Sequence, residues 1–263
     1  VNLQSPQGGF AVTQERQLSS PLTLQSATIE VDAKLSGTRM DVITPQLNGA
    51  LMPLLVGSKV DGRTPQDAVQ IQTDDAARLF FEKIVLGSSQ PGQDIWFQTQ
   101  PSNASDKLVF NSPVEVKTLG NTRFSGLVSG QGLAVVGPGH TTHLDGADVQ
   151  QSDDVRINDR VLVSEDSLIE VLRTGGSISI LGGIEVAAGK TLQLLADQIV
   201  LGPYAAGTPV GITLHQGATL VLGAGKITVD RDMVVFDSDG GHVVLRGAPD
   251  LSKRQERSMA PDA

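Results

Sequence analysis

Short apolar stretches recur along the second half of the chain at a nearly constant interval. Between Val155 and Leu245, one series of apolar centres recurs about every 21 residues, a spacing within the range of structural repeats: Ile157, Ile178, Ile199, Leu220 and Val243. A second series has nearly the same spacing: Val171, Leu192, Leu214 and Val234. A third begins with Val163 and Ile184, is interrupted by the Pro203-to-Pro209 loop and resumes at Ile227. Self-similarity at a fixed period of this size is typical of a solenoid.

The repeating stretches have the pattern of β-strands. Most alternate apolar and polar residues over three to five positions, as in Ile178-Ser179-Ile180 and Ile227-Thr228-Val229, and this is the period of a half-buried strand. Glycines separate the stretches and favour tight corners over helices. Since three stretches occupy each period, the sequence predicts an all-β, three-sided solenoid with about 21 residues per turn and about twelve turns at the strand spacing of roughly 4.8 Å.

The rest of the chain is organised around this coil. Residues 1–26 are polar with sparse apolar positions, and we expect an extended N-terminal arm that acts as a cap or an inter-subunit strand. Residues 27–107 are expected to form an N-terminal β part, with a loop excursion off the coil at 45–68 where prolines and glycines cluster. Residues 108–247 are expected to form the regular β-helix. Residues 248–263 are expected to form a polar C-terminal tail.

Composition narrows the classes of partner and site. The formal net charge of −9 argues against nucleic acid as a partner. The chain has no cysteine, so disulfides, thiolate metal sites and cysteine nucleophiles are excluded. No run of eighteen apolar residues occurs, so no transmembrane helix is predicted. Because the chain starts at Val1 without a Met, we expect a segment processed from a longer precursor.

The pattern of residues 121–163 resembles that of a known group of proteins. It contains Gly130-Gln131-Gly132, an apolar strand, Gly137-Pro138-Gly139 and then further strands. This cadence is similar to the repeats of large secreted bacterial adhesins of the filamentous-haemagglutinin and autotransporter-passenger type, and the resemblance covers about residues 108–247. It implies a right-handed parallel β-helix in an extracellular or cell-surface protein, and it carries over no catalytic residue. Residues 1–107 do not match that pattern.

Carboxylates are the first candidates for chemistry, because some β-helical proteins act on polysaccharides. Glycoside hydrolysis needs two carboxyl groups placed across one sugar. The acidic candidates are Asp74-Asp75, Asp153-Asp154, and Asp237 and Asp239 beside His242. Adjacent residues on a strand point to opposite faces, so an Asp-Asp pair supplies one carboxyl group to a site. We therefore predict turn carboxylates, no catalytic residue and a protein that is not an enzyme.

Metal binding is a second hypothesis. Four carboxylates near the end of the coil are candidate ligands for calcium, which takes six to eight oxygens: Asp230, Asp232, Asp237 and Asp239. No complete calcium loop is present, so turn carboxylates are the alternative. His140 and His143 are a candidate metal pair, and surface histidines are the alternative. No other cofactor is predicted.

The predicted function follows from the shape of a solenoid. Each end exposes unpaired strand edges, which invite the addition of another chain. We predict a secreted structural or adhesive protein, either an adhesin segment or a matrix or filament subunit, that binds copies of itself or a surface glycan or protein receptor. The candidate assembly residues are Phe10, Val12, Leu22 and Leu24. The alternative is a carbohydrate-active β-helix similar to a phage tail-spike or polysaccharide lyase, which would require a recurrent charged column that the sequence does not display.

Overall fold

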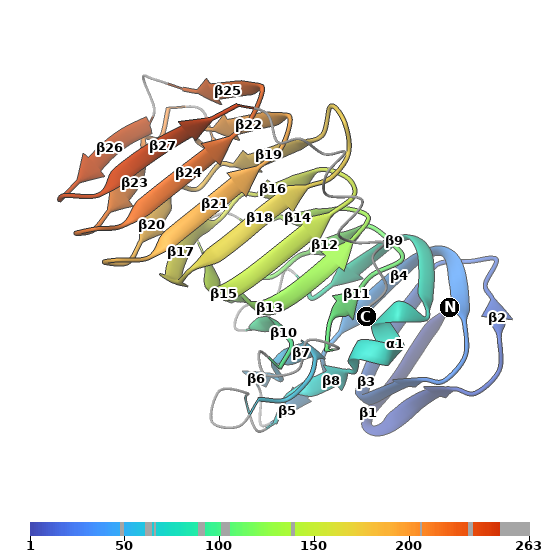
Figure 1. Ribbon diagram of the computed structural model, residues 1–263. Coiled ribbons are helices and arrows are strands. Elements are labelled where there is room, and N and C mark those ends of the chain that lie inside the picture. Colours follow the sequence, from blue (N-terminus) through green and yellow to red (C-terminus); the bar gives the residue numbers. More distant parts are fainter. Residues whose placement is uncertain are drawn as a thin grey trace.

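The prediction of an all-β solenoid is confirmed. The computed structural model describes residues 1–47, 50–60, 65, 67–88, 93–100, 106–137, 140–205, 207–230 and 234–247. Strands account for 60% of the structure and helix for 2%, and a large parallel sheet wraps almost closed around an axis. Figure 1 shows the resulting parallel β-helix, with the first turn (blue) and the last turn (red) at opposite ends of the coil.

The chain forms one short helix and many short strands among the described residues. The helix is α1 (Thr73–Ala77). The strands are β1 (Asn2–Val12), β2 (Arg16–Gln17), β3 (Leu22–Val31), β4 (Leu35–Ile43), β5 (Gln46–Leu47), β6 (Ala50–Leu51), β7 (Leu54–Gly57), β8 (Val69–Ile71), β9 (Leu79–Leu86), β10 (Ile95–Gln98), β11 (Leu108–Val109), β12 (Val114–Val116), β13 (Thr122–Gly130), β14 (Leu133–Val135), β15 (Thr141–Gln151), β16 (Val155–Ile157), β17 (Arg160–Glu165), β18 (Ser167–Val171), β19 (Ser177–Ile180), β20 (Ile184–Val186), β21 (Thr191–Leu195), β22 (Gln198–Leu201), β23 (Val210–Leu214), β24 (Thr219–Gly223), β25 (Lys226–Val229), β26 (Val234–Ser238) and β27 (His242–Arg246).

The strands line three faces, and several long strands bend across two of them. Face 1 runs β1, β3, β4, β9, β12, β14, β16, β19, β22 and β25. Face 2 runs β1, β3, β8, β7, β10, β13, β15, β17, β20, β23 and β26. Face 3 contains β2, β4 and β9, then β11, β13, β15, β18, β21, β24 and β27.

Among the described residues, face 1 has ten strand segments, and face 2 has eleven because β7 and β8 both lie on it, so this part of the coil has about ten turns and not the twelve predicted. At about 4.8 Å per turn its length is roughly 45 Å. Face-1 partners between Val114 and Ile199 are close to one predicted period apart in the sequence. Elsewhere insertions lengthen a turn, and the pairing of Met40 with Ile84 spans twice the usual stretch of chain.

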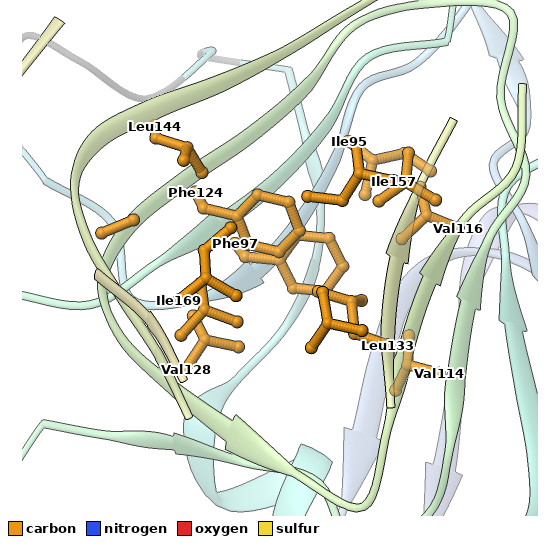
Figure 2. Close-up of a cluster of buried hydrophobic side chains, with 14 of the residues drawn as sticks. Ile95, Phe97, Val114, Val116, Phe124, Val128, Leu133, Leu144, Ile157 and Ile169 are labelled. Carbon is orange, nitrogen blue, oxygen red and sulfur yellow. The ribbon is translucent and has the colours of Figure 1, made fainter. Parts of the chain in front are cut away.

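Alternation within each strand builds the core. Inward side chains of successive turns stand in register and form continuous apolar columns along the axis. Phe97 and Phe124 are directly paired on face 2, and their rings stack with centroids 4.6 Å apart and 7° between planes. Phe110 meets Phe97 edge-on at 6.1 Å. Figure 2 shows the rings of Phe97 and Phe124 among aliphatic side chains from the other faces, which is the dense packing that stabilises protein interiors.

Residues 1–26 are not the predicted arm. β1 pairs in parallel with β3 along both face 1 and face 2, and β2 pairs with β4 on face 3. This segment therefore forms the first turn of the coil and begins the second.

The excursion predicted at residues 45–68 is only partly an excursion. β5 and β6 form an antiparallel hairpin, which leaves the coil, but β7 returns to face 2 and is buried between β8 and β10. α1 follows β8 along the chain. The carboxylate of Asp75 accepts hydrogen bonds from the backbone N–H of Val31 at 2.8 Å and of Gln72 at 3.1 Å, so it anchors the helix on the coil.

None of the three predicted columns stays on one face. The second passes from Leu192 on face 3 to Leu214 on face 2, and the third passes from Ile184 on face 2 to Ile227 on face 1. The first also changes face. Ile199 lies on face 1, whereas Leu220 lies on face 3, where its partners are Leu192 and Val243. The partner of Ile199 in the next turn is Ile227, well over one period later, because the loop before β23 lengthens this turn. The apparent period between Ile199 and Leu220 is therefore a coincidence. The predicted tail, 248–263, lies outside the described residues. Within the described ranges, no helix is long and apolar enough to cross a bilayer.

Candidate functional site

The last turn of the coil presents an unpaired edge on each face. Among the described strands, β25, β26 and β27 each pair with one neighbour only: β22, β23 and β24 respectively. Their inward positions continue the apolar columns but are no longer covered. Phe236, Val243 and Leu245 are 49%, 43% and 68% exposed, whereas their partners in the turn before are at most 2% exposed. This C-terminal end face therefore displays the cross-section of the hydrophobic core.

The first turn is the corresponding face at the other end. Leu3 on face 1 is 39% exposed, although its partner Leu24 is buried. A hollow of about 230 Å³ opens here, and its apolar lining includes Leu3, Phe10, Val12, Leu18 and Leu22. The N-terminal end face is thus recessed, and the C-terminal end face carries projecting apolar side chains.

The predicted assembly residues all belong to this N-terminal part, at two depths. Phe10 and Val12 line the hollow directly on the first turn, and Phe10 is only partly buried. Leu22 is 1% exposed and forms part of the floor of the hollow from the second turn. Leu24 is also buried and lies beneath Leu3. The sequence pattern does not mark Phe236, Val243 and Leu245 as assembly residues, because it is the pattern of an ordinary strand.

The calcium candidates do not converge on one described site. Asp230 follows β25, Asp237 lies on β26 and Asp239 follows that strand. Asp232 lies outside the described residues. In the part of the chain that the structure describes, no group of three or more histidine, aspartate or glutamate side chains could hold a metal ion, and that includes the neighbourhoods of His140 and His143.

Face 2 carries a charged surface that the sequence analysis missed. Arg123 stacks over the ring of Trp96 at 4.7 Å and pairs with Asp145 in the next turn. Further along, Glu185 pairs with Arg160 and lies 3.0 Å from the Nε2 atom of His215. The partners are 22 to 30 residues apart in the sequence, about one turn. The sequence feature that could have revealed this surface is therefore a pair of opposite charges separated by one repeat. These carboxylates are already ion-paired, which favours a structural use over general acid or base catalysis.

The predicted acidic pair Asp153-Asp154 lies beside a shallow groove on face 1. Asp153 and Asp154 lie 3.0 and 3.3 Å from the guanidinium of Arg173, and Asp154 also accepts a 2.8 Å hydrogen bond from the backbone N–H of Ser177. The groove has a volume of about 350 Å³ and is lined by both acidic and basic side chains. At its other end, the carboxylate of Glu115 lies 2.5 Å from the Lys83 ammonium.

A buried carboxyl group lies inside the corner between β16 and β17. Asp159 is 1% exposed, and its Oδ2 accepts a hydrogen bond of 3.3 Å from the hydroxyl of Thr142, while its Oδ1 has no partner. Burial raises the pKa of Asp159 to about 7, and the Thr142 hydrogen bond opposes this only in part. Gly182 of the next turn covers this corner, since a Cβ there would lie 2.1 Å from the carbonyl carbon of Asp159.

No family model, curated protein or solved structure matches this chain.

Proposed function

We propose that this protein is a non-enzymatic, extracellular structural or adhesive β-solenoid, a cell-surface adhesin segment or matrix subunit, whose copies assemble end to end. The observation that carries this proposal is the pair of open end faces, one recessed and one projecting. The repeat cadence of residues 121–163 supports the extracellular setting. The ion-paired carboxylates of faces 1 and 2 support a structural use of the charged surface.

Each end of the coil exposes unpaired strand edges. A parallel coil has the same strand direction in every turn, so the last turn of one copy offers its edges to the first turn of another with the correct polarity. Unpaired backbone groups at such edges are templates for strand addition. The two surfaces differ, so the contact is heterologous, and a heterologous contact that does not close forms a filament.

The free energy of this contact is a balance between the burial of apolar side chains and the cost of association. Burying the exposed half of Phe236, Val243 and Leu245 contributes about 1 kcal/mol for each side chain. Association costs at least about 4 kcal/mol in lost translational and rotational freedom. Burial of these three side chains of the C-terminal end face therefore does not offset the cost of association. Strand pairing on faces 1, 2 and 3, together with filling of the hollow, must supply the remaining free energy. We expect assembly that depends strongly on concentration.

The test uses two neighbouring positions on β26. Phe236 continues an inward column from Ile212, whereas Val235 follows Gly211 and points outward. Both are about half exposed, at 49% and 58%, so Phe236→Lys and Val235→Lys add the same charge to opposite sides of one strand. We expect the wild type and Val235→Lys to form rods that lengthen with concentration in negative-stain electron microscopy and light scattering, and Phe236→Lys to stay monomeric.

Circular dichroism establishes that both variants are folded. Wild-type particles of constant length, roughly 45 Å at every concentration, would refute end-to-end assembly. Assembly that is blocked by Val235→Lys and spared by Phe236→Lys would refute the end face as the contact and indicate lateral association.

The face-1 groove favours one alternative, a carbohydrate-active or glycan-binding β-helix. Its rim combines Glu115 and Asp154 with Arg156, and groups of this kind hydrogen-bond sugar hydroxyls. Binding of acidic or neutral oligosaccharides, measured by calorimetry and lost in Arg156→Ala, would support this alternative. Release of new reducing ends would show that the protein is an enzyme.

A further inference from the structure

We propose that a second copy of this chain stacks in unbroken register, so that β1 of one copy becomes the eleventh face-1 strand of the copy before it. In this junction Val229 lies against Leu3, and Ser238 lies against Phe10. This inference rests on the proposed end-to-end assembly and specifies its geometry.

Face 1 provides the first argument. One inward column runs without a polar interruption from the first turn to the last: Leu3, Leu24, Val42, Leu86, Val116, Val135, Ile157, Ile180, Leu201 and Val229. Placing Leu3 of a second copy after Val229 continues this column with another aliphatic side chain. A shift by one residue would instead turn the apolar positions outward, because side chains alternate along a strand.

Face 2 provides an independent argument from size. The column that begins at Phe10 in the first turn runs through Ile29, Ile71 and Phe97 and ends at Ser238 in the last turn. Ser238 pairs with Leu214 in the turn before it, and Phe10 is only partly buried and lines the hollow. The register thus sets a small side chain of the last turn of one copy against a large, partly buried ring of the next copy.

The hollow and the charges agree with this register. The recess of about 230 Å³ in the N-terminal end face has an apolar lining, and the projecting apolar side chains of the preceding copy's last turn would fill it. The outward positions that meet are Thr228 with Asn2 on face 1, and Asp237 with Gly9 on face 2. Neither contact brings like charges together, so the junction has no repulsive pair at these positions.

The absence of cysteine from the chain permits a direct test of the register. Neighbouring parallel strands lie about 4.8 Å apart, and disulfides form between Cα atoms about 4.4–6.8 Å apart. We expect Asn2→Cys/Thr228→Cys to give covalent dimers and higher multiples on mild oxidation. The control Gln4→Cys/Thr228→Cys moves one thiol two residues along the same outward side of β1, about 6.6 Å away, and should remain uncrosslinked.

Each result separates the register from the assembly. Rods that crosslink through the control pair, or through neither pair, would overturn the register and leave end-to-end assembly standing. Chains that form no rods would overturn both proposals. Thiol labelling of Phe236→Cys in dilute monomer tests whether residues 248–263 of the same chain cover the end face, because this position points into the uncovered end of the core. Rapid labelling is expected, and protection in the monomer would overturn the second copy as occupant.

Discussion

The buried Asp159 makes a sharp prediction about stability and pH. In the folded protein its pKa is raised from 3.8 to about 7 by burial, so between these values the native state keeps a proton that the unfolded chain has released. The native state then binds more protons, and the free energy of unfolding falls as pH rises. This contribution is fully present below about pH 4 and is lost as pH rises through 7.

The size of the effect follows from the separation of the two pKa values. About three pH units at 1.36 kcal/mol per unit give a ceiling of about 4 kcal/mol. Between pH 5 and pH 8 the expected loss is about 2–3 kcal/mol, and relaxation of the corner would reduce it. Asp159→Asn keeps the shape of the side chain and removes its charge, so it should flatten this part of the pH profile.

The assay is urea unfolding at pH 5, 6, 7 and 8, followed by circular dichroism and by the fluorescence of Trp96, the single tryptophan. The matched control is Asp153→Asn, which removes a half-exposed carboxylate at the other end of β16. This variant should keep the wild-type slope of unfolding free energy against pH. Parallel pH profiles for the wild type and Asp159→Asn would refute the reasoning, because Asp159 would then be ionised in the folded protein or open to water.

Two further predictions test the core and face 2. Replacing Phe97 by alanine removes a 1% exposed ring that stacks on Phe124, and it should lower the free energy of unfolding by about 3–5 kcal/mol. The control is Phe80→Ala, since Phe80 is 38% exposed. An equal loss of stability in both variants would contradict the packing argument. Burial, and next the charge of Arg123, lower the pKa of His143. Its midpoint in an NMR titration should therefore lie below 6.5 and should rise in Arg123→Gln. An unshifted midpoint in both proteins would contradict this.

The strand pattern could be predicted from the sequence because the period of two and the glycine corners are local properties. The predicted repeat period holds between Val114 and Ile199, where the loops are short. The assignment of stretches to faces required pairing, which a long loop disturbs: Ile199 and Leu220 are separated by one apparent period yet lie on different faces.

The candidate site was harder to predict, for two physical reasons. Residues 1–26 resemble a solvated arm because their apolar residues are sparse, and only the long-range pairing of β1 with β3 and of β2 with β4 shows that they belong to the coil. Asp159 resembles an ordinary turn carboxylate, and only the neighbouring turns show that Gly182 and Thr142 enclose it.

The sequence by itself determined that this chain is a coil of short parallel strands with an aliphatic interior, because alternation and corner glycines act within a few residues. Only the tertiary structure decided which side chains are neighbours across turns. It placed Arg123 against Asp145, enclosed Asp159, and left Phe236 and Leu245 uncovered at the end of columns that are buried elsewhere. In a solenoid, burial depends on whether a further turn follows, and that is a property of the stack rather than of any one repeat.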